Sequence, residues 1–144
     1  MRFLLKKFSQ QPLTLRECFL ETCLVKVLIV DDSSAMRMLV KRTLKQAGFS
    51  GLDITEAEDG AVALEKVEDV MPQLILCDWN MPNMTGIEFL EALRESGSEA
   101  KFGFVTTEST AEMRTRARDA GAQFLIAKPF NAESFEKTLR PIIG

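Results

Sequence analysis

The chain has 144 residues, of which 46% are hydrophobic and 27% are charged, as expected for one globular domain. It contains no histidine, which excludes histidine metal ligands, histidine general bases and a phosphohistidine on this chain. The net charge is −3, and residues 25–144 carry 14 basic and 19 acidic side chains, which argues against nucleic-acid binding by this region.

From residue 25 onward, short apolar runs alternate with stretches of helical periodicity. In chain order they predict a strand at Val25–Val30, a helix at Ser34–Ala47, a strand at Leu52–Ala57, a helix at Ala61–Val70, a strand at Gln73–Cys77, a helix at Ile87–Glu95, a strand at Phe102–Val105, a helix at Ala111–Ala120, a strand at Gln123–Ala127 and a helix at Ala132–Ile143. Thr85 and Glu88 have the spacing of a capping box, and Ser109 with Glu112 predicts a similar start for the fourth helix.

Five strand–helix units with short links predict an α/β fold, in which helices cover both faces of a doubly wound parallel sheet. The runs Val27–Val30 and Leu74–Cys77 are apolar throughout, as expected for strands that are buried on both sides. The predicted domain therefore covers residues 25–144. Residues 1–24 are interpreted as an N-terminal extension of unknown role.

Several targeting and cross-linking features are missing from the sequence. Residues 1–24 lack the apolar stretch of a signal peptide, and no apolar run approaches the roughly 20 residues of a membrane span. The three cysteines have no zinc-site spacing, and Cys77 is predicted to be a small buried residue in a reducing compartment. These features favour a cytoplasmic protein with no membrane insertion.

Polar side chains directly follow four of the five predicted strands. They are Asp31 and Asp32 after the first strand, Asp78 after the third, Thr106 and Thr107 after the fourth, and Lys128 after the fifth. The carboxyl ends of parallel strands meet at one edge of the sheet, where such folds bind ligands, so these side chains are predicted to share one cleft. Clustered carboxylates repel unless a cation bridges them, and an all-oxygen ligand set favours Mg²⁺.

Such a cleft suits phosphoryl transfer, which needs mainly positioning and charge neutralisation. The spacing alone leaves open which carboxylate attacks. Asp31 and Asp32 are adjacent and are interpreted as metal ligands, whereas Asp78 stands alone at the end of the middle strand and is favoured as the nucleophile of an aspartyl phosphate. Taken singly, an Asp–Asp pair most often lies in a loop or caps a helix, and only the combination at four strand ends favours a site.

Five segments resemble the receiver domains of bacterial two-component signalling, and most closely the single-domain chemotaxis regulators of that family. The segments are Val27–Arg37, Glu56–Gly60, Cys77–Gly86, Val105–Glu108 and Ala127–Phe130. The resemblance spans residues 25–144 and implies a flavodoxin-like sheet with strand order 2-1-3-4-5.

The resemblance also implies a role for each matching residue of the cleft. The phosphoacceptor would be Asp78, the magnesium ligands would be Asp32, Asp78 and the backbone carbonyl of Asn80, with Asp31 acting through a water, the switch hydroxyl would be Thr106, and the phosphate-contacting lysine would be Lys128.

One position departs from the family pattern. The family has a switch aromatic three residues before the lysine, and in motor-binding members this residue is tyrosine. In this sequence the position is occupied by Leu125. Phe124 is adjacent, but alternation along a strand predicts that it faces the opposite side of the sheet. This departure weakens the expectation of a flagellar motor target and leaves the phosphorylation chemistry unaffected.

The resemblance predicts a single-domain response regulator in chemotaxis or flagellar motor control, which takes its phosphoryl group from a sensor histidine kinase and is not itself an enzyme. The expected partners are that kinase, a separate downstream target, with the flagellar motor switch as one candidate, and a phosphatase. Two alternatives stay open: a receiver that serves as a phosphate sink or regulates a non-motility pathway, and a magnesium-dependent phosphatase. The second requires a spacing of two residues between aspartates, which Asp31 and Asp32 do not have.

Overall fold

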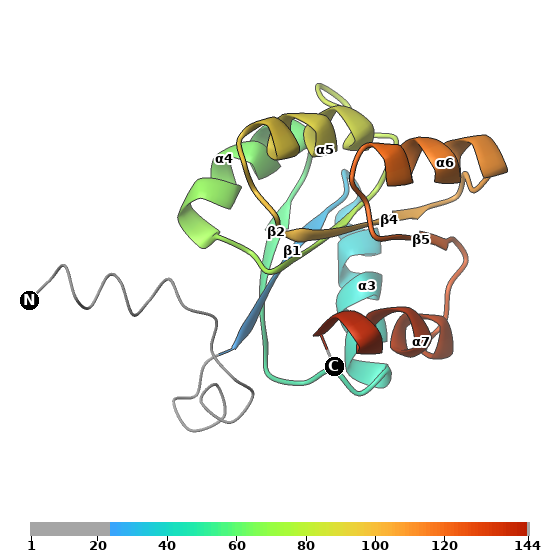
Figure 1. Ribbon diagram of the computed structural model, residues 1–144. Coiled ribbons are helices and arrows are strands. Elements are labelled where there is room, and N and C mark those ends of the chain that lie inside the picture. Colours follow the sequence, from blue (N-terminus) through green and yellow to red (C-terminus); the bar gives the residue numbers. More distant parts are fainter. Residues whose placement is uncertain (1–23, 144) are drawn as a thin grey trace, which may run out of the picture.

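The computed structural model of the protein describes residues 24–143, so the predicted extension lies outside the described residues except for Leu24. A sheet of five parallel strands forms its centre: β1 (Val25–Val30), β2 (Leu52–Ala57), β3 (Leu74–Cys77), β4 (Lys101–Thr106) and β5 (Phe124–Ala127). The strands lie in the order β2-β1-β3-β4-β5, which confirms the predicted topology (Figure 1).

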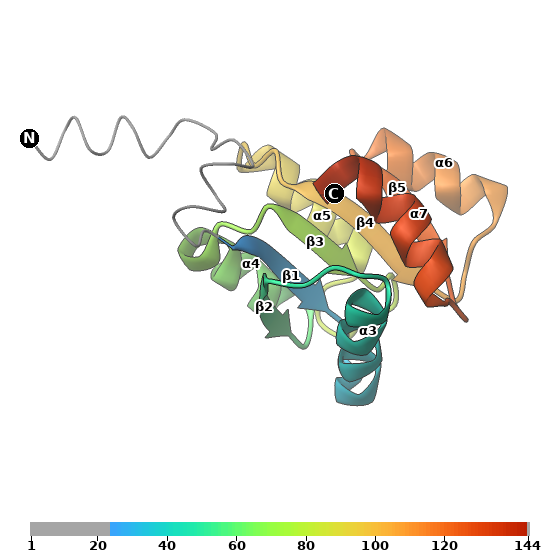
Figure 2. The ribbon, with the colours of Figure 1, turned by 90° about the horizontal axis from the view of Figure 1, so that it is seen from below.

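In the described part of the chain, five helices cover the sheet: α3 (Ser34–Gln46), α4 (Gly60–Val70), α5 (Gly86–Glu95), α6 (Ala111–Asp119) and α7 (Ala132–Ile143). Helices α3 and α7 cover one face, whereas α4, α5 and α6 cover the other (Figure 1). Figure 2 views the molecule from the side of α3 and α7, with the sheet behind them. Within residues 24–143, none of the helices has the length and apolar character that a membrane crossing would need.

The central strands are buried on both faces, because successive side chains of a strand point to opposite sides. Leu28 and Ile75 belong to the core under α4, α5 and α6, while Val27 and Leu74 belong to the core under α3 and α7. All four side chains are fully buried. The runs Val27–Val30 and Leu74–Cys77 are therefore apolar because both faces of these strands are buried, as the sequence predicts.

The predicted capping box of α5 is present. The Thr85 hydroxyl accepts from the Glu88 backbone N–H, and the Glu88 carboxylate accepts from the Thr85 backbone N–H. For α6 the predicted cap Ser109 is wrong, because Thr110 is the residue directly before the first helical turn. Its hydroxyl accepts from the Met113 N–H, so Glu112 stands one position too early to complete a box.

Candidate functional site

Parallel pairing carries the site residues to one edge of the sheet. The pairing of β1 with β3 continues past the end of β3, since the Asp78 N–H donates to the carbonyl of Val30, the last residue of β1, at 2.9 Å. In the same way the Lys128 N–H donates to the Thr106 carbonyl at 2.8 Å, beyond the end of β5. These backbone hydrogen bonds therefore fix the main-chain positions of Asp78 and Lys128 at the sheet edge, independently of the contacts that their side chains make.

Three carboxylates meet at this edge, as the sequence predicts. Asp31 and Asp32 follow β1 and Asp78 follows β3, and one oxygen from each lies within 4.8 Å of the others. They differ in exposure, because Asp31 is buried, Asp78 is half-buried and Asp32 is exposed. The cluster thus opens to solvent on the side of Asp32.

Lys128 reaches into the cluster from the end of β5. Its Nζ lies 3.2 Å from Oδ2 of Asp31 and 3.7 Å from Oδ2 of Asp78. The Lys128 side chain is only 11% exposed, so these contacts are poorly screened by water. Lys128 is followed by a cis peptide bond to Pro129.

In Asp31 and Asp78, the carboxylate oxygen that does not face Lys128 accepts a hydrogen bond from the backbone. Oδ1 of Asp31 accepts from the Ser33 N–H at 2.9 Å, and Oδ1 of Asp78 accepts from the Trp79 N–H at 2.8 Å. Burial raises the pKa of Asp78 above its ordinary value and the Asp31 charge adds to this, while Lys128, the Trp79 N–H and the Thr106 hydroxyl act in the opposite direction. The net result is a carboxylate that is more basic than an ordinary aspartate.

The two predicted hydroxyls are not equivalent. Thr106 is fully buried beside Asp78, and its Oγ1 lies 3.4 Å from the Glu108 N–H in the link that leads to α6. Thr107 is exposed. Only Thr106 is therefore placed between the carboxylates and a helix that covers the sheet.

Asn80 is exposed in the loop after β3, two residues beyond Asp78. Within residues 24–143 its backbone carbonyl accepts no hydrogen bond from another backbone group. The predicted role of this carbonyl as a ligand stays a prediction.

Gly86 was not assigned a role by the sequence, although it closes one of the matching segments. A side chain at Gly86 would place its Cβ 2.2 Å from the Asp78 carbonyl oxygen, and the Gly86 N–H donates to the Trp79 carbonyl at 2.9 Å. Only glycine therefore allows the start of α5 to approach the loop that carries Asp78 this closely.

The donor set fits a hard divalent cation. When all groups are ionised, three carboxylates and one ammonium leave an excess of negative charge, and every candidate ligand atom is an oxygen. Asp31, Asp32 and Asp78 could therefore hold Mg²⁺, which binds oxygen ligands and often keeps several waters. Cys77, whose pKa burial raises well above its usual range, is an inert thiol on the core side.

Leu125 and Phe124 lie on opposite faces of β5, as the alternation predicts. Leu125 packs on the α6 side, and Phe124 on the side of α3 and α7, where its ring leaves no room for a side chain at Gly103. A shallow hollow of about 240 Å³ lies between α6 and β5, and its lining residues are Arg114, Ala117, Arg118, Ala122, Gln123, Phe124 and Leu125. No aromatic ring occupies the position of Leu125.

Comparisons with known proteins agree with this geometry. The family described as the response regulator receiver domain matches residues 27–140. Chemotaxis protein CheY1 of Helicobacter pylori is 34% identical over 123 residues, which cover 83% of this chain and 98% of that protein. A probable chemotaxis protein CheY of Rhizobium etli is 35% identical over 122 residues, covering 83% of this chain and 93% of that protein.

A solved structure shows the same fold. The chemotaxis response regulator CheY4 of Vibrio cholerae superposes with a TM-score of 0.74 and 37% identity, covering 83% of this chain and 99% of that one.

Proposed function

The chain belongs to the response regulator receiver domain family, and from this premise we propose that Asp78 accepts a phosphoryl group from a sensor histidine kinase and that a separate protein recognises the phosphorylated form. The observation that carries the proposal is the contact of one lysine with two of three clustered carboxylates, Asp31 and Asp78. A family fold alone would not identify the reacting residue.

Among the three carboxylates, Asp78 is best placed to attack. Both oxygens of the buried Asp31 are engaged, one by the Ser33 N–H and the other by Lys128. Asp32 is exposed, and within residues 24–143 its carboxylate has no hydrogen bond or ion pair that would hold it in an attacking position. Asp78 combines partial access with a fixed Oδ1, a raised pKa and a cation near Oδ2.

In the proposed step, an Asp78 oxygen forms a bond to phosphorus while the phosphorus–nitrogen bond of the kinase phosphohistidine breaks, and the nitrogen keeps the electron pair. Lys128 neutralises charge on the transferred oxygens. Asp32, Asp78 and the Asn80 carbonyl would hold Mg²⁺, with Asp31 acting through a water, and the ion when bound supplies further neutralisation of the phosphoryl oxygens. The chain assists only its own phosphorylation and dephosphorylation, so it is not an enzyme in the usual sense.

The signal would leave the site through Thr106. A phosphoryl group adds nearly two negative charges and three acceptor oxygens beside this buried hydroxyl. Movement of Thr106 toward the phosphoryl oxygens would pull on the link to α6 and change the surface formed by α6, β5 and α7. A target protein that binds this surface would then distinguish the two forms.

We propose chemotaxis as the pathway because the relatives of similar length named above are chemotaxis proteins. We also propose that the protein is cytoplasmic and that a phosphatase is one of its partners. The receiver would cover residues 25–144, and residues 1–24 would be an extension. One observation favours a second candidate: Leu125 replaces the switch aromatic, which suits a phosphate sink or a regulator of a pathway other than motility.

The proposal is tested by phosphorylation with acetyl phosphate and Mg²⁺. We expect one hydroxylamine-labile phosphate per chain, as for an acyl phosphate, and we expect Asp78→Asn to abolish it. Asp53→Asn, which alters an exposed carboxylate of β2, is the matched control and should label normally. Labelling of Asp78→Asn at the level of the unchanged chain would refute the assignment, and turnover of small phosphate esters would favour the phosphatase alternative instead.

A further inference from the structure

Two matching segments, Val27–Arg37 and Glu56–Gly60, hold residues that the phosphorylation mechanism does not use. The two segments are joined by the guanidinium of Arg37 in α3. Its Nε donates to Oε1 of Glu56 at 2.9 Å, and its Nη1 donates to the backbone carbonyl oxygen of Asp31. One side chain thus connects the loop after β1 with the edge strand β2.

Glu56 provides a fixed anchor for this connection. Lys41 donates to its second oxygen at 2.8 Å, and Lys66 donates to its backbone carbonyl. The hydrogen bond from Lys41, followed by that from Arg37, lowers the pKa of Glu56 below its ordinary value. The anchor therefore stays ionised at neutral pH, and the Arg37 side chain, only 16% exposed, is held between two rigid partners.

The carbonyl that Arg37 holds belongs to the peptide plane between Asp31 and Asp32. The Asp31 N–H is already bonded to the Ala57 carbonyl at 3.1 Å, so Arg37 adds a second connection between this loop and β2. With both ends of the residue fixed, the direction in which the chain enters Asp32 is fixed as well.

Asp32 depends on that backbone more than its neighbours do. Asp31 and Asp78 are oriented by hydrogen bonds and by Lys128, whereas the Asp32 carboxylate makes no hydrogen bond or ion pair with any of residues 24–143. An exposed carboxylate without such contacts can be preorganised only through its main chain.

We infer that Arg37 is a positioning residue for the acidic cluster: anchored on Glu56, it orients the Asp31–Asp32 peptide and so presents Asp32 to the metal ion. This inference rests on the proposed function, which assigns Asp32 to the metal site. Lysine could not replace Arg37, because one ammonium cannot reach a carboxylate and a carbonyl from two separated nitrogens of a planar group.

The test measures Mg²⁺ binding by titration calorimetry on the full chain without a phosphodonor. Arg37→Lys should weaken Mg²⁺ affinity by about tenfold or more, the loss usual for groups that orient metal ligands. Lys41→Ala is the matched control, because Lys41 shares Glu56 with Arg37 but does not contact Asp31. Its affinity should stay within about threefold of the unchanged chain.

A second readout separates positioning from general damage. In labelling with acetyl phosphate, Arg37→Lys should raise the Mg²⁺ concentration needed for half-maximal rate but recover the normal rate at saturating Mg²⁺. Glu56→Gln, which weakens the anchor and keeps its shape, should shift the same concentration by a smaller factor, and it serves as the test if Arg37→Lys does not fold.

The outcomes distinguish the inference from the function on which it rests. If Asp32→Ala weakens Mg²⁺ binding and neither Arg37→Lys nor Glu56→Gln does, the role of Arg37 is refuted and the metal site stands. If Asp32→Ala leaves the affinity unchanged, the assignment of the metal site itself fails. Equal losses in Arg37→Lys and Lys41→Ala would also overturn the inference, since they would report only the shared ion pair.

Discussion

Helices α5 and α6 cover the same face of the sheet and both begin with a threonine cap, yet they are held in different ways. Helix α5 buries five residues, which are Gly86, Ile87, Phe89, Leu90 and Leu93, whereas α6 buries only Ala117. Because packing of an apolar face supplies most helix stability in proteins, α5 is a fixed support and α6 is a weakly attached element. The weakly attached helix is the one that follows Thr106.

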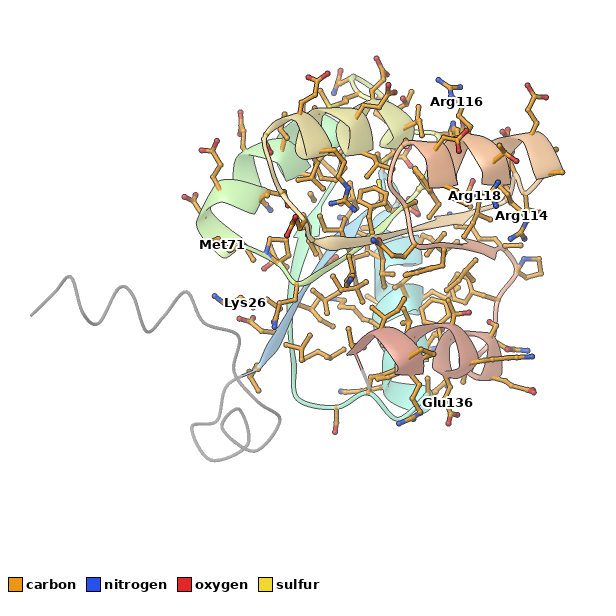
Figure 3. All side chains as sticks on the ribbon, viewed as in Figure 1. Lys26, Met71, Arg114, Arg116, Arg118 and Glu136 are labelled. Atoms are coloured by element: carbon orange, nitrogen blue, oxygen red, sulfur yellow. The ribbon has the colours of Figure 1, made fainter. Side chains whose placement is uncertain are left out.

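The charges on the two helices extend the contrast. Helix α6 carries Arg114, Arg116 and Arg118, all of them exposed (Figure 3). The guanidinium of Arg116 lies 5.9 Å from the centre of the ring of Trp79, the residue that follows Asp78 in the sequence. Nη1 of Arg114 donates to the Leu125 carbonyl at 3.5 Å. These contacts come from exposed charged side chains, and such contacts contribute little and can rearrange.

The largest expected effect tests the packing difference directly. Leu93→Ala in α5 should lower the free energy of unfolding by about 2–5 kcal/mol, because it removes a fully buried side chain and leaves a cavity. Met113→Ala in α6 should cost about 1 kcal/mol, because Met113 is only half-buried. Urea unfolding with an unchanged slope measures both values. Equal costs would break the contrast between the helices.

A smaller effect is expected from phosphorylation itself. Acetyl phosphate with Mg²⁺ should change the opening free energy of α6 amides by about 1 kcal/mol, roughly fivefold in exchange rate, and should leave α5 unchanged. Hydrogen exchange resolved by residue provides the measurement. The Asp78→Asn chain under identical conditions is the control, and an equal response in α5 would show that the signal does not leave by the weakly attached helix.

Much of the fold could be predicted because its signals are local. Apolar runs predict the strands, and the polar residues that follow them predict that Asp31, Asp78 and Lys128 lie together, as the distances confirm. Alternation along one strand was enough to put Phe124 and Leu125 on opposite faces.

What could not be predicted depends on contacts between distant segments. Ser109 and Thr110 both offer a hydroxyl at the start of α6, and the path of the link from β4 decides which of them caps the helix. The hydrogen bond from Arg37 to the Asp31 carbonyl depends on Glu56, which lies 19 residues after Arg37. No local sequence pattern indicates that Arg37 and Glu56 are in contact. The ligand role of the Asn80 carbonyl depends on an ion and on loop geometry, and it stays a prediction.

The smallest expected effect concerns the cap of α5, whose box α6 lacks. The backbone N–H of Thr85, followed by its hydroxyl, donates to the Glu88 carboxylate and lowers the pKa of Glu88. A lowered pKa in the folded state means that the stabilisation is fully present above the ordinary value of about 4.3. It is lost as the pH falls through the lowered value of the folded protein.

Glu88→Gln keeps the shape of the cap and removes this titration. The unchanged chain should therefore be more stable than the variant at pH 6, and the difference should shrink steadily as the pH is lowered toward 3, as followed by urea unfolding at each pH. In a Thr85→Ala background the same substitution should produce a weaker pH dependence, because one of the two donors is gone. A difference that is constant with pH would mean that the cap of α5 does not depend on charge, so that burial alone separates the fixed helix from the weakly attached one.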